Sequence, residues 1–170
     1  MTNADTVREL FRHMEWADAA IWTAVLARES CRTDARLQEI LYHLHVAQRA
    51  FLRTWRNEPR EAPYPQFDDA CPLMQWARAY YGEAMAYLHG ASDEAMSQPM
   101  PLPWSDMVKQ KLGRMPEVTT IGETALQVAM HSAHHRGQAN ARVREAGGEP
   151  PLVDYIAWVW LGRPQAAWPC

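Results

Sequence analysis

The sequence lacks any run of apolar residues long enough to cross a lipid bilayer, because polar residues interrupt every hydrophobic stretch. A membrane-spanning helix needs about 20 consecutive apolar residues. The first ten residues, MTNADTVREL, also lack the charged-then-apolar pattern of a secretion signal. We therefore expect a soluble, cytoplasmic protein with no membrane partner.

An excess of one charge sign is also missing. The chain has 17 basic and 20 acidic residues, and no long run of either kind occurs. A nucleic-acid interface normally needs a basic patch or stripe. We therefore expect no nucleic-acid partner.

Cysteine is scarce, with only Cys31, Cys71 and Cys170 in the chain. Their number is odd, their spacing is wide, and no CxxC motif occurs. None of them stands beside a histidine in the sequence. The pattern predicts free thiols in a reducing compartment.

Helical periodicity, by contrast, is strong near the N-terminus. From Asp5 to about Arg28, apolar residues recur every three or four positions without glycine or proline. Thr33 or Asp34 can then cap a second helix, which we expect to run to about Trp55.

A loop with three prolines follows, and Asp68 or Asp69 can cap a third helix beyond it. The segment 90–118 has four prolines and little periodicity, so we expect a long crossover with a weak hairpin or a helical turn. The third helix has large apolar residues at helical spacing, namely Trp76, Tyr80, Met85 and Leu88.

Thr120 and Glu123 form a capping-box signature at the start of a fourth helix. We expect this helix to run to about Ala146, because Gly147-Gly148 is a typical helix end. A last short helix is expected over Val153–Leu161.

Together these segments predict an all-α fold. Four long amphipathic helices, with a long crossover before the fourth, favour a four-helix bundle followed by a short C-terminal helix. The 170 residues, 48% of them hydrophobic, suit a single domain over 1–170.

The stretch HSAHHRGQ in the fourth helix contains a candidate metal site. His131 and His135 are four residues apart, so their side chains lie one above the other on a helix and can bind a single ion. A hydrated polar edge without metal would show the same pattern, so the pair alone leaves both interpretations open.

Helical phase separates the histidines of this stretch. Relative to the apolar face of the fourth helix, His135 lies roughly 50° and His131 roughly 90° from the centre, whereas His134 lies roughly 150° away. The pair therefore borders the core, and His134 faces solvent or a partner. Arg136 lies on the opposite edge, where a structural or interface role is expected.

The second helix offers two further histidines. His45 lies roughly 80° from the centre of that helix's apolar face, and His43 about 120° away on the other side, near Glu39. His45 is therefore the better candidate for a third ligand. A hydrogen-bonding role for His45 at a helix interface is an equally open alternative.

Several of these segments resemble the DinB/YfiT family of metalloenzymes over nearly the whole chain. The most specific is HxxxH followed by RGQ, residues 131–138. Leu44-His45 with an aromatic residue six positions later is similar too. So are MEWAD at 14–18 and the C-terminal pieces DYI at 154–156 and GRP at 162–164.

The resemblance implies a four-helix bundle, often a homodimer, that holds a divalent metal ion. It implies one histidine ligand from the second helix and two from the fourth, which by position are His45, His131 and His135. Zinc or nickel would be the expected metal, with iron as a further option, since imidazole suits all of them.

A three-histidine site leaves a coordination position open, which is the pattern of a catalytic site. Such an ion lowers the pKa of a bound water or thiol. Relatives imply a thiol S-transferase or isomerase that uses a low-molecular-weight thiol cosubstrate, with a hydrolase as a weaker option; the small-molecule substrate and general base are unknown. The alternative is a non-catalytic metal- or partner-binding bundle in a stress response.

Overall fold

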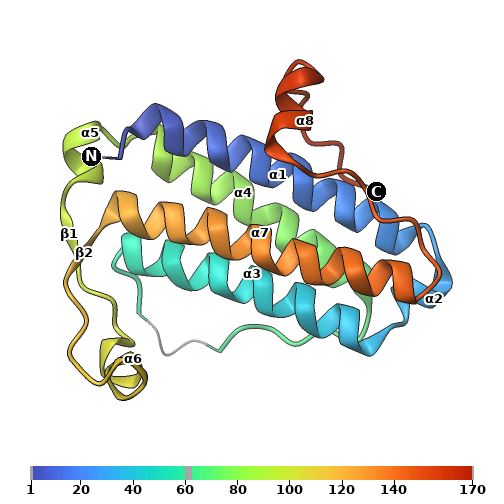
Figure 1. The fold of residues 1–170 in the computed structure, drawn as a ribbon, viewed down its shortest axis with the longest axis horizontal. Helices are drawn as coiled ribbons and strands as arrows, with labels where there is room; N and C mark the ends of the chain where they lie inside the picture. Colours follow the sequence, from blue (N-terminus) through green and yellow to red (C-terminus); the bar gives the residue numbers. More distant parts are fainter. Residues whose placement is uncertain (1, 60–62, 170) are drawn as a thin grey trace.

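The computed structural model describes residues 2–59 and 63–169. Helix α1 packs against α4 and α7, and α3 packs against the same two helices, so the four close into a ring. The expected all-α four-helix bundle is confirmed (Figure 1). Its long helices are α1 (Ala4–Leu26), α3 (Ala35–Trp55), α4 (Ala70–His89) and α7 (Ile121–Glu145).

Helices α1 and α7 run in one direction along the bundle, and α3 and α4 run in the other (Figure 1). The long crossover from α4 to α7 contains a pair of short strands and the short helices α5 and α6. Its two short strands are antiparallel, with Pro99 opposite Thr120. The shorter elements are α2 (Glu29–Arg32), α5 (Asp93–Met96), β1 (Pro99–Met100), α6 (Ser105–Leu112), β2 (Thr119–Thr120) and α8 (Tyr155–Trp160).

Local signals explain where the long helices begin and end. The Asp34 side chain accepts a hydrogen bond from the backbone N–H of Leu37 and so caps α3. The predicted capping box of Thr120 and Glu123 is present at the start of α7. After α7 the chain turns at Gly147, whose φ of 80° suits glycine.

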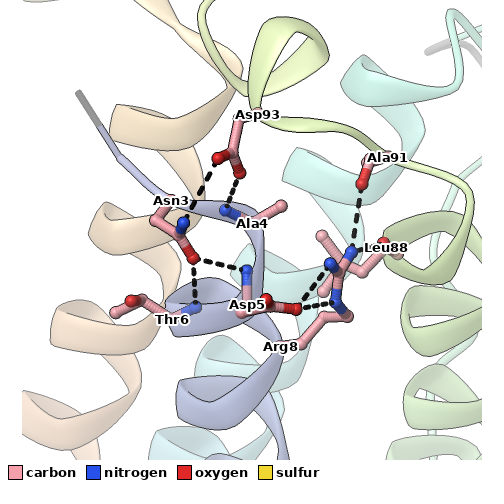
Figure 2. A network of polar contacts seen from close by, with 8 residues as sticks. All are labelled: Asn3, Ala4, Asp5, Thr6, Arg8, Leu88, Ala91 and Asp93. Atoms are coloured by element: carbon pink, nitrogen blue, oxygen red, sulfur yellow. Dashed lines mark hydrogen bonds and ion pairs between the residues drawn. The ribbon is translucent and has the colours of Figure 1, made fainter.

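The N-terminal end of the bundle is held by polar contacts between α1, α4 and α5 (Figure 2). The Asp93 carboxylate accepts a hydrogen bond of 2.7 Å from the backbone N–H of Ala4. The Arg8 guanidinium donates to the carbonyl oxygens of Leu88 and Ala91, at 2.8 and 3.0 Å. These contacts satisfy backbone groups that a helix end leaves without partners.

The core consists of two hydrophobic clusters along the bundle. One contains Phe11 and Tyr80, and the other contains Trp22 and Val143. Between them, at mid-length, lies a layer of buried polar side chains that we call the central polar layer. Its members are Asp18, His45, Gln48, Tyr81, Ser132 and Arg136.

Over the described residues, no helix is both long and apolar enough to cross a membrane. Cys31 is a buried free thiol, as expected. Cys170 lies outside the described residues.

Candidate metal centre

The long helix α7 brings His131 and His135 together on one face, with their ring centroids 4.3 Å apart. The neighbouring helix α3 adds a third imidazole, that of His43. Its ring centroid lies 5.4 Å from that of His131 and 4.6 Å from that of His135. Three histidines from two packed helices therefore meet at one place, which we call the histidine cluster.

The spacing within the histidine cluster suits a shared ion. One ring nitrogen from each histidine lies within 4.8 Å of the corresponding nitrogens of the other two. Zinc binds imidazole nitrogen at about 2.0–2.1 Å, so nitrogens that share an ion lie roughly 3.3 Å apart. Small side-chain rotations would close that difference, and the three residues could hold a metal ion.

Burial keeps two of these imidazoles neutral. Burial, together with the neighbouring His135 and His43, lowers the pKa of His131 to about 4. Burial also lowers the pKa of His135, although the hydrogen bond that His135 donates to Gln138 partly opposes this. Because only neutral imidazole has a lone pair for a metal ion, the cluster is ready for coordination near neutral pH.

One atom of the cluster also lacks the partner that burial normally demands. The Nε2 atom of His131 is buried and has no hydrogen-bond partner among the described residues. Buried polar atoms are rarely left without a partner in folded proteins, and the binding of an ion is one recognised explanation for such an atom. This atom therefore fits the role of a metal ligand.

The structure does not bring His45 to the cluster. His45 is fully buried, and its Nε2 accepts a hydrogen bond of 3.0 Å from the indole N–H of Trp22. Its Nδ1 lies 2.9 Å from Oε1 of Gln48. Burial is the largest cause that lowers the pKa of His45. Both ring nitrogens are engaged within the core, which is the hydrogen-bonding alternative considered for this residue.

Helical phase alone could not have chosen between the two histidines of α3. It placed His45 and His43 on opposite flanks of the apolar face, but it did not say which flank meets α7. In the structure the flank of His43 meets α7, while Tyr42 on another side stacks with Trp76 of α4. The third member of the cluster is therefore His43 in place of the expected His45.

The central polar layer lies behind the cluster and was not expected from the sequence. The Gln48 amide donates to Oδ2 of Asp18 at 2.9 Å and to Oγ of Ser132 at 3.1 Å. The Tyr81 hydroxyl donates to the same Asp18 oxygen. The signal that could have revealed the layer is Asp18 itself, a charged residue among the apolar positions of α1.

The other two residues singled out in HSAHHRGQ also have clear positions. His134 is exposed, as predicted. Arg136 is almost fully buried and pairs with Asp18, with its Nη1 2.9 Å from the carboxylate Oδ1. The structural role expected for Arg136 is confirmed, and it has no part in the cluster.

The chemistry of the cluster follows from its donor set. Among the described residues no carboxylate or thiol joins the three imidazoles, and His43 is exposed. Three neutral ligands leave the charge of a divalent ion uncompensated, and the exposed side leaves room for a fourth ligand from outside. This arrangement is typical of a site that activates a bound molecule.

Comparison with known families places the chain in one of them. The DinB family model matches residues 1–165 of the chain. The chain belongs to the DinB family. The match covers this DinB protein from α1 to α8, including the residues of the histidine cluster and of the central polar layer. A search of curated proteins gives no match.

Proposed function

We propose that this DinB protein binds one divalent transition-metal ion through His43, His131 and His135. The observation that supports this proposal most directly is the convergence of three imidazole nitrogens within 4.8 Å of one another. The buried, unpartnered Nε2 of His131 supports it independently.

The donor set favours zinc or nickel, with iron as a third option. Imidazole nitrogen suits these metals, whereas magnesium and calcium prefer oxygen ligands. The cluster contains no carboxylate, which disfavours a hard cation.

We further propose that the bound ion serves a thiol S-transferase or isomerase reaction. When bound, such an ion would lower the pKa of a thiol or water at its open position. The chain's own residues hold the neutral imidazoles in place and leave the His43 side accessible to a low-molecular-weight thiol and a second substrate. No acidic side chain in the cluster can act as general base.

The first experiment is metal analysis of protein purified without a histidine tag. We expect about one ion per chain in the wild type, and at least a 100-fold loss of affinity in His43→Ala, His131→Ala and His135→Ala. The exposed His89 at the end of α4 provides the matched control, and His89→Ala should bind like the wild type. Unchanged binding by His43→Ala, with loss in His45→Asn, would instead support the set expected from the sequence.

The second experiment tests catalysis. Metal-loaded protein is incubated with a panel of low-molecular-weight thiols and a chlorinated nitrobenzene, and thioether formation is followed by absorbance. We expect turnover with at least one thiol, and none after chelation or in His131→Ala. Stoichiometric metal without turnover would favour the non-catalytic metal-binding bundle.

We also propose that the protein is a homodimer. Five of its exposed apolar side chains lie within ten residues of one another at α8, and such a surface is typical of an interface. They are Leu152, Tyr155, Ile156, Trp160 and Leu161.

A further inference from the structure

The side chain of Gln138 on α7 bridges two imidazoles. Its Oε1 lies 2.8 Å from Nδ1 of His135, and its Nε2 lies 3.0 Å from Nε2 of His134. The spacing explains the contacts, because residues three and four apart on a helix are neighbours on its surface. Gln138 thus connects His135 of the histidine cluster to His134, which lies outside the cluster.

Hydrogen-bond chemistry assigns the protons in this chain of contacts. An amide oxygen only accepts, so the Nδ1 of His135 must donate and must have the hydrogen. An amide nitrogen only donates, so the Nε2 of His134 must accept. A neutral imidazole has a single N–H, and the Nε2 of His135 is therefore left with a free lone pair.

A second histidine in the protein has the same contact with a glutamine three residues later, but its other ring nitrogen is differently occupied. His45 and Gln48 are also three residues apart on a helix, and their Nδ1 to Oε1 distance is 2.9 Å. There the indole N–H of Trp22 donates to Nε2 of His45, so the lone pair of this nitrogen is already engaged. At His135 no such donor is present among the described residues, so the lone pair stays available in the cluster.

We propose that Gln138 is a positioning residue for the metal ligand His135. It fixes the tautomer with hydrogen on Nδ1 and holds the ring so that Nε2 faces the cluster, while His134 fixes the direction of the Gln138 amide. The inference rests on the proposed metal function. Partners of this kind, one step beyond the ligands, typically change metal affinity by about 10–100-fold.

The test compares two substitutions of Gln138 with a matched control. Gln138→Leu removes the acceptor, and we expect zinc affinity to fall about 10–100-fold in competition with a chelating dye. Gln138→Glu keeps an acceptor for the Nδ1–H and should bind within about threefold of the wild type. Gln138 is exposed, so neither change disturbs the core. Gln75→Leu, an exposed glutamine on α4, should bind zinc unchanged.

A second measurement is independent of metal. In metal-free protein, ¹⁵N chemical shifts of the His135 ring report which nitrogen has the hydrogen. We expect the Nδ1–H tautomer to dominate in the wild type and in Gln138→Glu, and a mixture of tautomers in Gln138→Leu. His134→Ala should give a smaller shift toward the mixture.

The outcomes separate this inference from the function on which it rests. A wild type that binds no zinc overturns the metal proposal, while the ring spectra still decide whether Gln138 sets the tautomer. A wild type that binds zinc no better than Gln138→Leu overturns the positioning role alone. An unchanged tautomer in Gln138→Leu does the same.

Discussion

The ion pair of Asp18 and Arg136 is the most deeply buried pair of charges among the described residues. The two side chains are 2% and 4% exposed, and they come from α1 and α7. Tyr81 and Gln48 complete the hydrogen bonding of the carboxylate. Burial and the Asp18 charge raise the pKa of Tyr81 well above its ordinary value, so the hydroxyl stays a donor.

Removal of one charge from this pair should therefore be costly. We expect Asp18→Ala to lower the free energy of unfolding by about 3–5 kcal/mol, because it leaves Arg136 buried and uncompensated. The double variant Asp18→Leu with Arg136→Met should recover much of this loss. Denaturant unfolding followed by circular dichroism provides the measurement.

A matched surface pair provides the control for that prediction. Arg36 and Glu39 on α3 are 3.0 Å apart with side chains 68% and 66% exposed. Glu39→Ala should cost less than about 1 kcal/mol, because water screens an exposed pair. If Asp18→Ala and Glu39→Ala lower the free energy of unfolding equally, the buried pair contributes no more to stability than the exposed one.

At the scale of elements, the C-terminal segment is held on α1 through His13. The Nε2 of His13 lies 3.0 Å from the carbonyl oxygen of Val153. Its ring contacts Tyr155 edge to face at a centroid distance of 5.3 Å and lies 5.6 Å from Trp158. The site is nearly closed to solvent, with His13 7% exposed.

This contact makes the docking of the C-terminal segment sensitive to acid. Burial is the largest cause that lowers the pKa of His13 from its ordinary value of 6.5; Arg136 lowers it too, while the Val153 hydrogen bond, Asp18 and Asp154 oppose the change. The unfolded chain therefore takes up a proton at a higher pH than the folded one. The contribution of His13 to stability is complete above about pH 6.5 and falls as the pH drops below it.

The prediction is tested by thermal unfolding between pH 7.5 and pH 5 in the presence of a chelator. We expect the wild type to lose more stability toward acid than His13→Gln, whose amide keeps a donor for the Val153 carbonyl but does not titrate. Parallel pH curves for the two proteins would exclude a role for His13 in the acid response.

At the scale of the whole molecule, the segment with α8 projects from the bundle beside α1 (Figure 1). Trp160 is 79% exposed and Leu161 is 65% exposed, and the helix itself contains no charged residue. A large exposed aromatic residue in an uncharged surface is typical of the centre of a protein interface.

Disruption of the exposed apolar patch at α8, formed by Leu152, Tyr155, Ile156, Trp160 and Leu161, should therefore change the oligomeric state. We expect the wild type to elute as a dimer in chromatography with light scattering, and Trp160→Ser with Leu161→Ser to shift the mass toward a monomer. Met107→Ser on α6 is the matched control, because Met107 is 66% exposed but lies outside the patch. A wild-type monomer at all accessible concentrations would contradict the homodimer.

Much of this architecture is determined locally and was therefore predictable. The capping box of Thr120 and Glu123 depends on residues three apart, and its presence confirms the predicted start of α7. The juxtaposition of His131 and His135 likewise needs only one turn of helix. The expected last helix over 153–161 is shorter than predicted, Tyr155–Trp160, because Asp154 has an extended backbone and stands as the N-cap.

The four long helices and the histidine pair on α7 arise from residues that are neighbours along the chain, so the amino-acid sequence alone was enough to predict them. The packing of the helices determined that His43, and not His45, completes the cluster, because this depends on which flank of α3 meets α7. It also decided the central polar layer, where Asp18 and Arg136 meet across 118 residues of sequence. Contacts at that separation are set by helix packing, which no local periodicity encodes.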